Sequence, residues 1–95
     1  MKLTHEQIER ELATLPDWKL AGEKLHREYK FSDFGMAIGF LAASAPSIEK
    51  MDHHPEWANV YNRVTVNLTS HDEGGVTDRD FRLARLLEKI AGKML

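Results

Sequence analysis

The sequence predicts an α+β fold with three helices and two antiparallel hairpins, in the order α-β-β-α-β-β-α. Three observations support this: two helix-capping patterns, two pairs of strand-like segments that each flank a short turn, and one long apolar segment between the pairs. The chain has 95 residues, of which 42% are hydrophobic, so it suits one modest core rather than two. We therefore expect residues 1–95 to form a single domain.

The first third of the chain predicts a helix followed by a hairpin. Thr4 and Gln7 mark the ends of a capping-box pattern, and apolar residues recur at helical spacing until Pro16, which predicts a helix over residues 4–15. A turn at Ala21-Gly22 then separates two segments with strand-like composition. The second segment alternates, and one of its faces should carry Leu25, Arg27, Tyr29 and Phe31.

The long apolar segment predicts a central helix, which Asp33 can cap. Pro46 lies inside this helix, so we expect a kink or a restart there, followed by a last turn over residues 47–51 that carries Glu49. The many Gly and Ala residues of the helix would let another helix approach closely, which makes self-association through it plausible. The buried stripe is expected to contain Phe34, Ile38, Leu41, Ala45 and Ile48.

The remainder of the chain predicts a second hairpin and a final helix. The segment after Trp57 has strand composition, a turn is expected at Asn62-Arg63, and the following residues alternate between apolar and polar over 64–69. Residues 71–75 are predicted to form a polar, glycine-rich loop. Thr77 and Asp80 form a second capping-box pattern ahead of a helix that carries apolar residues as far as Met94.

Composition argues against several classes of function. Lys and Arg number 13 against 15 Asp and Glu, and the resulting net charge of -2 disfavours a nucleic-acid-binding surface. The chain has no cysteine, so disulfides and thiolate chemistry are excluded. The N-terminus lacks the apolar run of a secretory signal, and the longest apolar stretch, 34–48, is shorter than the ~20 residues that cross a bilayer. We therefore expect no membrane partner and a cytoplasmic location.

The most informative segment is Glu49-Lys-Met-Asp-His53-His54-Pro55, because imidazole can both give and take a proton near neutral pH. Glu49 precedes His53 by four residues, so in a helix its carboxylate could orient that imidazole; the alternative is a solvated surface pair. Pro55 biases the residue before it toward an extended conformation. The side chains of His53 and His54 should then point in different directions, and could line two walls of a cleft.

Four further residues each have a structural and a functional interpretation. His71 opens the predicted loop, where a lone histidine is usually solvated but where functional groups are often presented. Asp80 can cap the last helix, contribute to a site, or do both. Trp18 and Trp57 are most simply core or sheet-face residues, although an aromatic ring beside histidines could stack on a flat heterocycle.

A metal site is the less favoured use of these histidines. Three histidines and a nearby carboxylate match the ligand set of a catalytic zinc ion. Two adjacent histidines, however, lack the i, i+4 spacing that turns both rings toward one ion. A zinc hydrolase therefore remains a rival interpretation, and a chelator would distinguish it.

The combined pattern resembles the motif of the pterin-4a-carbinolamine dehydratase family, and the resemblance covers nearly the whole chain. It implies that the two hairpins form one four-stranded antiparallel sheet with three helices packed on it. It also implies an enzyme that is active without metal or organic cofactor and that dehydrates the 4a-hydroxytetrahydropterin released by aromatic amino-acid hydroxylases to a quinonoid dihydropterin. The motif positions are filled here by Glu49, His53, His54, Pro55, Tyr61, His71 and Asp80.

The resemblance implies roles for individual residues and for partners. Proton transfer would fall to His53, His54 and His71. The expected partners are the pterin substrate, a functional link to a hydroxylase, and further copies of the chain in a homodimer or a dimer of dimers. The alternative is a dimerisation or coactivator-type protein-binding module without essential catalysis, because animal members of the family also act as dimerisation partners of a transcription factor. Residues expected to contact the substrate or orient the histidines are Glu49, Pro55, Ser70, Asp72, Glu73, Asp80 and Trp18.

Overall fold

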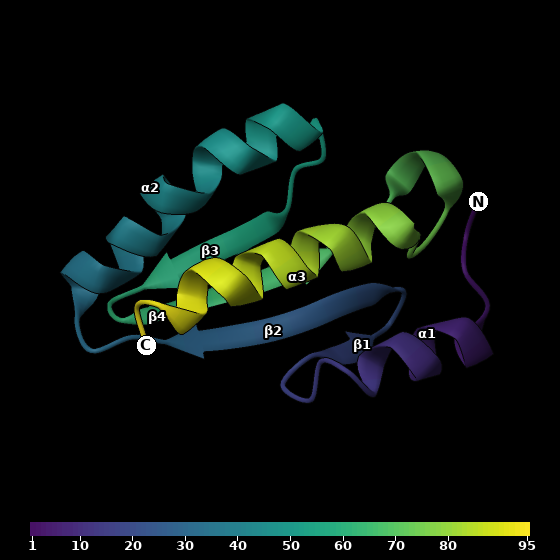
Figure 1. The fold of residues 1–95 in the computed structure, drawn as a ribbon, viewed down its shortest axis with the longest axis horizontal. Helices are drawn as coiled ribbons and strands as arrows, with labels where there is room; N and C mark the ends of the chain where they lie inside the picture. Colours follow the sequence, from purple (N-terminus) through teal and green to yellow (C-terminus); the bar gives the residue numbers. More distant parts are fainter.

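The computed structural model describes residues 1–95 and contains three α-helices, four β-strands and one short 3-10 helix. Their order along the chain and their assembly around a single antiparallel sheet confirm the predicted fold class (Figure 1). The elements are α1 (His5–Leu12), β1 (Lys19–Ala21), β2 (Lys24–Lys30), α2 (Phe34–Met51), β3 (Glu56–Val60), β4 (Arg63–Leu68), η1 (His71–Glu73) and α3 (Asp78–Gly92).

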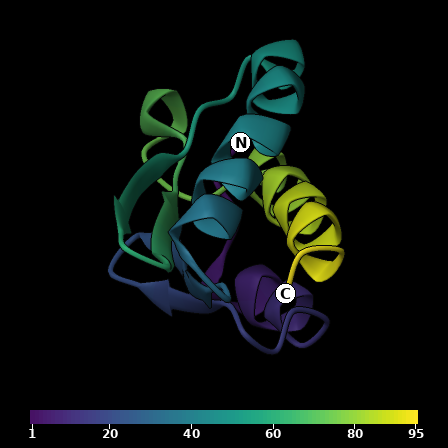
Figure 2. The same cartoon turned by 90° about the vertical axis from the view of Figure 1, so that its left-hand side faces the viewer.

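The sheet has the strand order β1-β2-β4-β3, and every neighbouring pair of strands is antiparallel. Its register aligns His26, Asn67 and Glu56 in one row across β2, β4 and β3. Successive residues of a strand point to opposite faces, so the neighbouring pair Leu25 and Leu68 points into the core. All three helices lie on that side of the sheet (Figure 2), and the row that contains Glu56 faces away from them.

Aromatic side chains from β2 and α2 form the centre of the core. Tyr29 and Phe40 are fully buried, with ring centroids 5.0 Å apart, and Phe31 packs on Phe40 at 5.2 Å. The predicted face of this segment is confirmed at Leu25 and Tyr29 of β2 and at Phe31 directly after it, which are all buried.

The buried face of α2 differs from the predicted stripe. Phe34 and Ile38 are 51% and 41% exposed, and of the predicted stripe only Ile48 is buried. The helix itself carries apolar residues on all of its sides, so hydrophobicity alone does not select the face that meets the sheet. The buried residues of the helix are Ala37, Phe40, Ser44 and Ile48.

The ends of two helices also refine the predictions. Thr4 and Gln7 form the expected capping box, but α1 ends at Leu12 instead of residue 15. The residues that follow form a turn ahead of Pro16, because a proline disfavours helical conformation in the residue before it. The expected restart at Pro46 is wrong, since α2 runs without interruption from Phe34 to Met51. Pro46 lies on the exposed side of the helix, where water can hydrate the carbonyl group left without a partner.

One turn precedes β4 and another follows it. The turn between β3 and β4 falls at Tyr61-Asn62, one residue earlier than predicted, and Tyr61 takes a left-handed φ of 52°. The predicted polar loop contains η1, one 3-10 turn that closes with Gly74 at a φ of 75°. A single turn carries no hydrophobic period, so the sequence could not reveal it.

None of the helices has the length and apolar character needed to cross a bilayer.

Candidate active site

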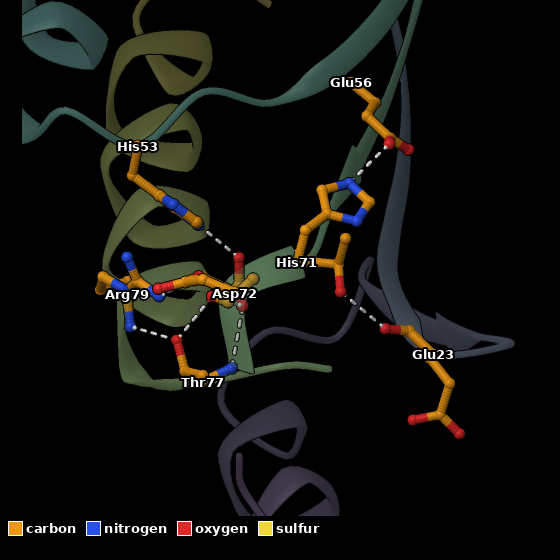
Figure 3. Close-up of polar contacts among 10 residues, drawn as sticks. Glu23, His53, Glu56, His71, Asp72, Thr77 and Arg79 are labelled. Atoms are coloured by element: carbon orange, nitrogen blue, oxygen red, sulfur yellow. Dashed lines mark hydrogen bonds and ion pairs between the residues drawn. The ribbon is translucent and has the colours of Figure 1, made fainter. Parts of the chain in front are cut away.

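His53 and Asp80 form a buried pair at the start of α3. The Nε2 atom of His53 lies 2.6 Å from Oδ1 of Asp80, and the two residues are 8% and 0% exposed. Figure 3 shows His53 extending from the segment after α2 toward the first turn of α3. An ionised carboxylate only accepts hydrogen bonds, so the Nε2–H group of His53 donates to Asp80. The carboxylate thereby fixes both the orientation and the tautomer of this ring.

The second oxygen of Asp80 caps α3. Its Oδ2 atom accepts hydrogen bonds from the backbone N–H of Thr77 and from the hydroxyl of Ser70, each at 2.8 Å. The hydroxyl groups of Ser70 and Thr77 also lie 2.8 Å apart. Thr77 and Asp80 therefore form the predicted capping box, and the same carboxylate that caps the helix holds His53. The structural and the functional interpretations of Asp80 hold at once.

The remaining nitrogen of His53 is the atom available for chemistry. His53 makes one side-chain hydrogen bond, through Nε2, and no buried side-chain nitrogen or oxygen of the chain lacks a partner. The Nδ1 atom must therefore lie in the small exposed part of the residue. A neutral His53 that donates through Nε2 presents a lone pair at Nδ1, which can take or return a proton at the surface.

His54 pairs with Glu49 on the surface. Its Nε2 atom lies 2.9 Å from Oε1 of Glu49, and the two side chains are 56% and 78% exposed. Of the two alternatives for Glu49, the orienting contact with His53 does not form, and the solvated surface pair does, with His54 in place of His53. Because Asp52 takes a left-handed φ of 52° at the end of α2, the chain leaves the helix before His53 and turns that side chain toward α3.

His71 is the first residue of η1 and contacts β3. Its Nε2 atom is 3.2 Å from Oε2 of Glu56, as Figure 3 shows, and its side chain is 76% exposed. The other oxygen of Glu56 accepts a hydrogen bond from Nζ of Lys24 at 2.6 Å. Lys24 and, less strongly, His71 lower the pKa of the Glu56 carboxyl group. The glutamate is thus ionised at neutral pH and acts only as an acceptor.

The acidic residues of η1 line part of a hollow of about 320 Å³ beside the start of α3. Asp72 accepts a hydrogen bond from Arg79 at 2.7 Å, and Glu73 lies 2.8 Å from the terminal amino group of Met1. Arg79 lowers the pKa of Asp72, and His53 is near enough to add a smaller effect of the same sign. Asp72 and Thr77 line this hollow, whereas none of the three histidines lines it or any other hollow of the molecule.

The structure joins some of the candidate residues directly and leaves others in separate contacts. Ser70 joins Asp80 and His53, and Pro55 is half-buried directly after His54. Trp18 instead packs in the core, and its Nε1–H donates to Oε1 of Glu88 at 2.8 Å. Glu88 lies eight residues after Asp80 on α3, which corresponds to roughly 12 Å along the helix axis.

Three residues around the candidate site were not singled out from the sequence. Glu56 and Lys24 hold His71, and Arg79 pairs with Asp72. Glu56 directly follows Pro55, so its position beside the histidine motif was the available signal. Lys24 and Arg79 gave no comparable signal, because their partners lie elsewhere in the sequence.

The side chains of the site do not converge on a metal position. No three histidine, aspartate or glutamate side chains come together in an arrangement that could hold an ion. Each histidine instead has its Nε2 atom beside a separate carboxylate, from Asp80, Glu49 or Glu56. In this arrangement each of the three imidazoles has a carboxylate partner at Nε2 and can exchange a proton through Nδ1.

Comparison with known proteins identifies the family. Residues 1–90 match the family model described as "Pterin 4 alpha carbinolamine dehydratase". A protein of Solibacter usitatus (strain Ellin6076) named "Putative pterin-4-alpha-carbinolamine dehydratase" is 51% identical over 95% of each chain, and one of the same name from Chelativorans sp. (strain BNC1) is 47% identical over 97% of this chain and 96% of its own. The crystal structure of the "transcriptional coactivator/pterin dehydratase" from Brucella melitensis superposes with a TM-score of 0.93, at 44% identity, over 96% of this chain and 99% of that one. The chain therefore belongs to the pterin-4a-carbinolamine dehydratase family.

Proposed function

We propose that this protein dehydrates 4a-hydroxytetrahydropterins to quinonoid dihydropterins, with the whole chain acting as one catalytic domain. The observation that carries the proposal is the buried His53–Asp80 pair, with the Nε2 atom of His53 at 2.6 Å from the carboxylate. A histidine held in one tautomer by a buried carboxylate is an arrangement well suited to general acid–base catalysis. Family membership supports the choice of substrate.

The reaction needs two proton transfers and no change of oxidation state. The C–O bond at the carbinolamine carbon breaks, and the departing hydroxyl takes up a proton to leave as water. A neighbouring ring nitrogen loses its proton, and its electron pair forms the new C=N bond. Imidazoles have pKa values near neutrality as a class, so positioned histidines can serve as both donor and acceptor in these steps.

The proposal gives each candidate residue a role. His53, His54 and His71 exchange protons with the substrate, and Asp80 and Glu49 hold two of these rings by their Nε2 atoms. Substrate contacts are further assigned to the half-buried corner after His54 and to the polar residues that follow β4. These are Pro55, Ser70, Asp72 and Glu73, with Trp18 proposed as a more distant contributor.

The first test is the dehydration rate of the purified protein before and after treatment with a chelator. We expect a rate that the chelator leaves unchanged, and His53→Ala and His71→Ala variants whose rates fall by roughly 10²–10⁴, as for a lost general acid or base. Loss of activity that zinc restores would favour the metal-hydrolase interpretation. Normal rates in both variants would remove the proton-transfer assignment.

A protein-binding role is the second candidate, and the exposed apolar face of α2 favours it. Phe34 and Ile38 leave much of their surface uncovered, and the Brucella melitensis neighbour bears the word "coactivator" in its name. We propose that another copy of this chain covers this face, in a homodimer or a dimer of dimers. Light scattering should then show an oligomer that Ala42→Glu weakens, since Ala42 is exposed on α2. A monomeric, active wild type would contradict this.

A further inference from the structure

His71 has the most exposed side chain of the three candidate catalytic histidines. It begins η1, a single 3-10 turn, and its side chain is 76% exposed. The contact between its Nε2 atom and Oε2 of Glu56, at 3.2 Å, is the one side-chain hydrogen bond that its ring makes. An exposed side chain with one partner depends on that partner for its orientation.

Glu56 lies on the open face of the sheet and has a second partner there. It is the first residue of β3 and pairs in register with Asn67 of β4, so its backbone position is fixed. Its Oε1 atom lies 2.6 Å from Nζ of Lys24, which comes from β2 on the far side of β4. One carboxylate oxygen therefore anchors the side chain to the sheet, and the other meets the histidine.

The charge of Glu56 determines which nitrogen of His71 carries hydrogen. Lys24 and His71 lower the pKa of Glu56, so the carboxylate is ionised and can only accept. The Nε2 atom of a neutral His71 must then carry the proton that it shares with Glu56. Its Nδ1 atom, which has no hydrogen-bond partner on the protein, keeps the free lone pair.

Glu56 also connects His71 to the buried pair through a short length of backbone. Residues 53–56 carry His53, which binds Asp80, and Glu56, which binds His71. Pro55 lies between them, and its ring restricts the backbone of this segment. Four consecutive residues thus supply one of the histidines and the carboxylate that contacts the other.

We propose that Glu56 is a positioning residue that holds the His71 imidazole in the Nε2–H form and leaves Nδ1 as the atom that exchanges a proton with the substrate. This inference rests on the proposed function, because it assigns the support for a histidine to which that function gives a proton-transfer role. Glu56 makes no contact with the reacting atoms in this assignment; it acts through His71.

The kinetic test compares Glu56→Ala with Glu56→Gln. We expect Glu56→Ala to lower kcat by about tenfold with KM within about twofold, as for other residues that orient a functional side chain. Glu56→Gln should stay within about threefold of the wild type, because its single amide oxygen can turn to accept from Nε2–H while water hydrates the exposed Lys24 ammonium group that it leaves. Glu28→Ala is the matched control. Glu28 is an exposed glutamate of β2, opposite Thr65, and lies on the same face of the sheet as Glu56.

Two further measurements separate positioning from a general structural effect. Adding Glu56→Ala to His71→Ala should cause no further loss of kcat, because both changes remove the same contribution. NMR coupling constants of the free protein should show one χ1 rotamer for His71 in the wild type and averaging in Glu56→Ala. These couplings do not depend on any activity.

The outcomes distinguish this inference from the proposed function. An unchanged kcat in Glu56→Ala, additive losses in the double variant, or an unaveraged His71 rotamer in Glu56→Ala would each overturn the role of Glu56. If His71→Ala itself turned over normally, the proton-transfer role of His71 would fail instead. The NMR couplings would then decide on their own whether Glu56 holds the ring.

Discussion

The pairs His53–Asp80 and His71–Glu56 use the same two functional groups in opposite surroundings. In the first pair the side chains are 9% and 0% exposed and the two atoms lie 2.6 Å apart; in the second they are 76% and 46% exposed and 3.2 Å apart. Asp80 accepts two further hydrogen bonds from the protein, whereas the partner of Glu56 besides His71 is the flexible side chain of Lys24.

The difference shows how burial changes what a histidine–carboxylate pair contributes. Water competes little for a buried hydrogen bond, so His53 is oriented before any substrate arrives. An exposed ion pair typically contributes about 0–1 kcal/mol, because solvent screens it and the side chains lose entropy. We therefore expect one rigid and one weakly held imidazole, and the first should be sensitive to changes that the second tolerates.

The largest expected effect comes from Asp80→Asn. The amide oxygen would replace Oδ2 at the Thr77 N–H, so the amide NH2 group would face Nε2 of His53 and force that ring into the opposite tautomer. Turnover should fall by about 10²–10⁴, as for other histidines held in the wrong tautomer. Steady-state rates and the melting temperature, measured together, check this.

A nearly unchanged melting temperature with reduced turnover would support the orienting role of Asp80. Unchanged turnover would contradict it, and would leave Asp80 as a helix cap alone. The equivalent change in the exposed pair, Glu56→Gln, provides the comparison, because there the fall in kcat should stay within about threefold.

The second largest expected effect is a loss of stability, which should be greater when the histidine of the buried pair is removed than when the histidine of the exposed pair is removed. His53→Ala leaves the Oδ1 atom of Asp80 buried without its partner, which should cost about 1–3 kcal/mol of unfolding free energy. His71→Ala removes an exposed contact and should change stability by less than about 0.5 kcal/mol. Urea denaturation of both variants measures the difference. Equal losses would show that burial does not distinguish the pairs.

The smallest expected effect concerns Glu88, a half-buried carboxylate that lies between these extremes. Burial alone would raise its pKa, but hydrogen bonds from Arg27, Tyr29 and Trp18 outweigh burial and lower the pKa. Its stabilising contribution is therefore complete above the unfolded-state pKa of roughly 4.3 and is lost as pH falls through the lower folded-state value.

Melting temperatures of the wild type and Glu88→Gln between pH 7 and pH 3 test this sign. Wild-type stability should fall more steeply than that of Glu88→Gln on acidification, so the gap between them narrows at low pH. Parallel curves would mean that the carboxylate gains nothing from its three donors.

Local signals explain why most of the fold could be predicted. The capping boxes at Thr4 and Thr77 and the alternation in β4 depend on residues close in sequence, and the structure confirms all three. The buried face of α2 depended on packing with distant elements. Because that helix is apolar on several faces, the sequence pattern supported the wrong one.

The same distinction applies to the candidate site. The sequence shows the residue types of the motif, but spacing offers Glu49 as the one nearby partner for His53, whereas the actual partner is Asp80, 27 residues away. Sequence spacing favours local partners, and the exit of the chain from α2 at Asp52 decides otherwise. The role of Glu56 does not follow from spacing, because its contact with His71 forms only once β3 and β4 are paired.

The two oxygens of Asp80 have a consequence for how position 80 tolerates replacement. One oxygen caps the first turn of α3 and the other holds His53. A substitution at position 80 can therefore reduce both the stability of the fold and the rate of turnover. In a saturation library screened only for abundance of folded protein, position 80 should already accept few residues. Ser70, whose hydroxyl binds the same carboxylate, is subject to the same double constraint, whereas Thr77 binds Asp80 through its backbone N–H, which every replacement except proline keeps.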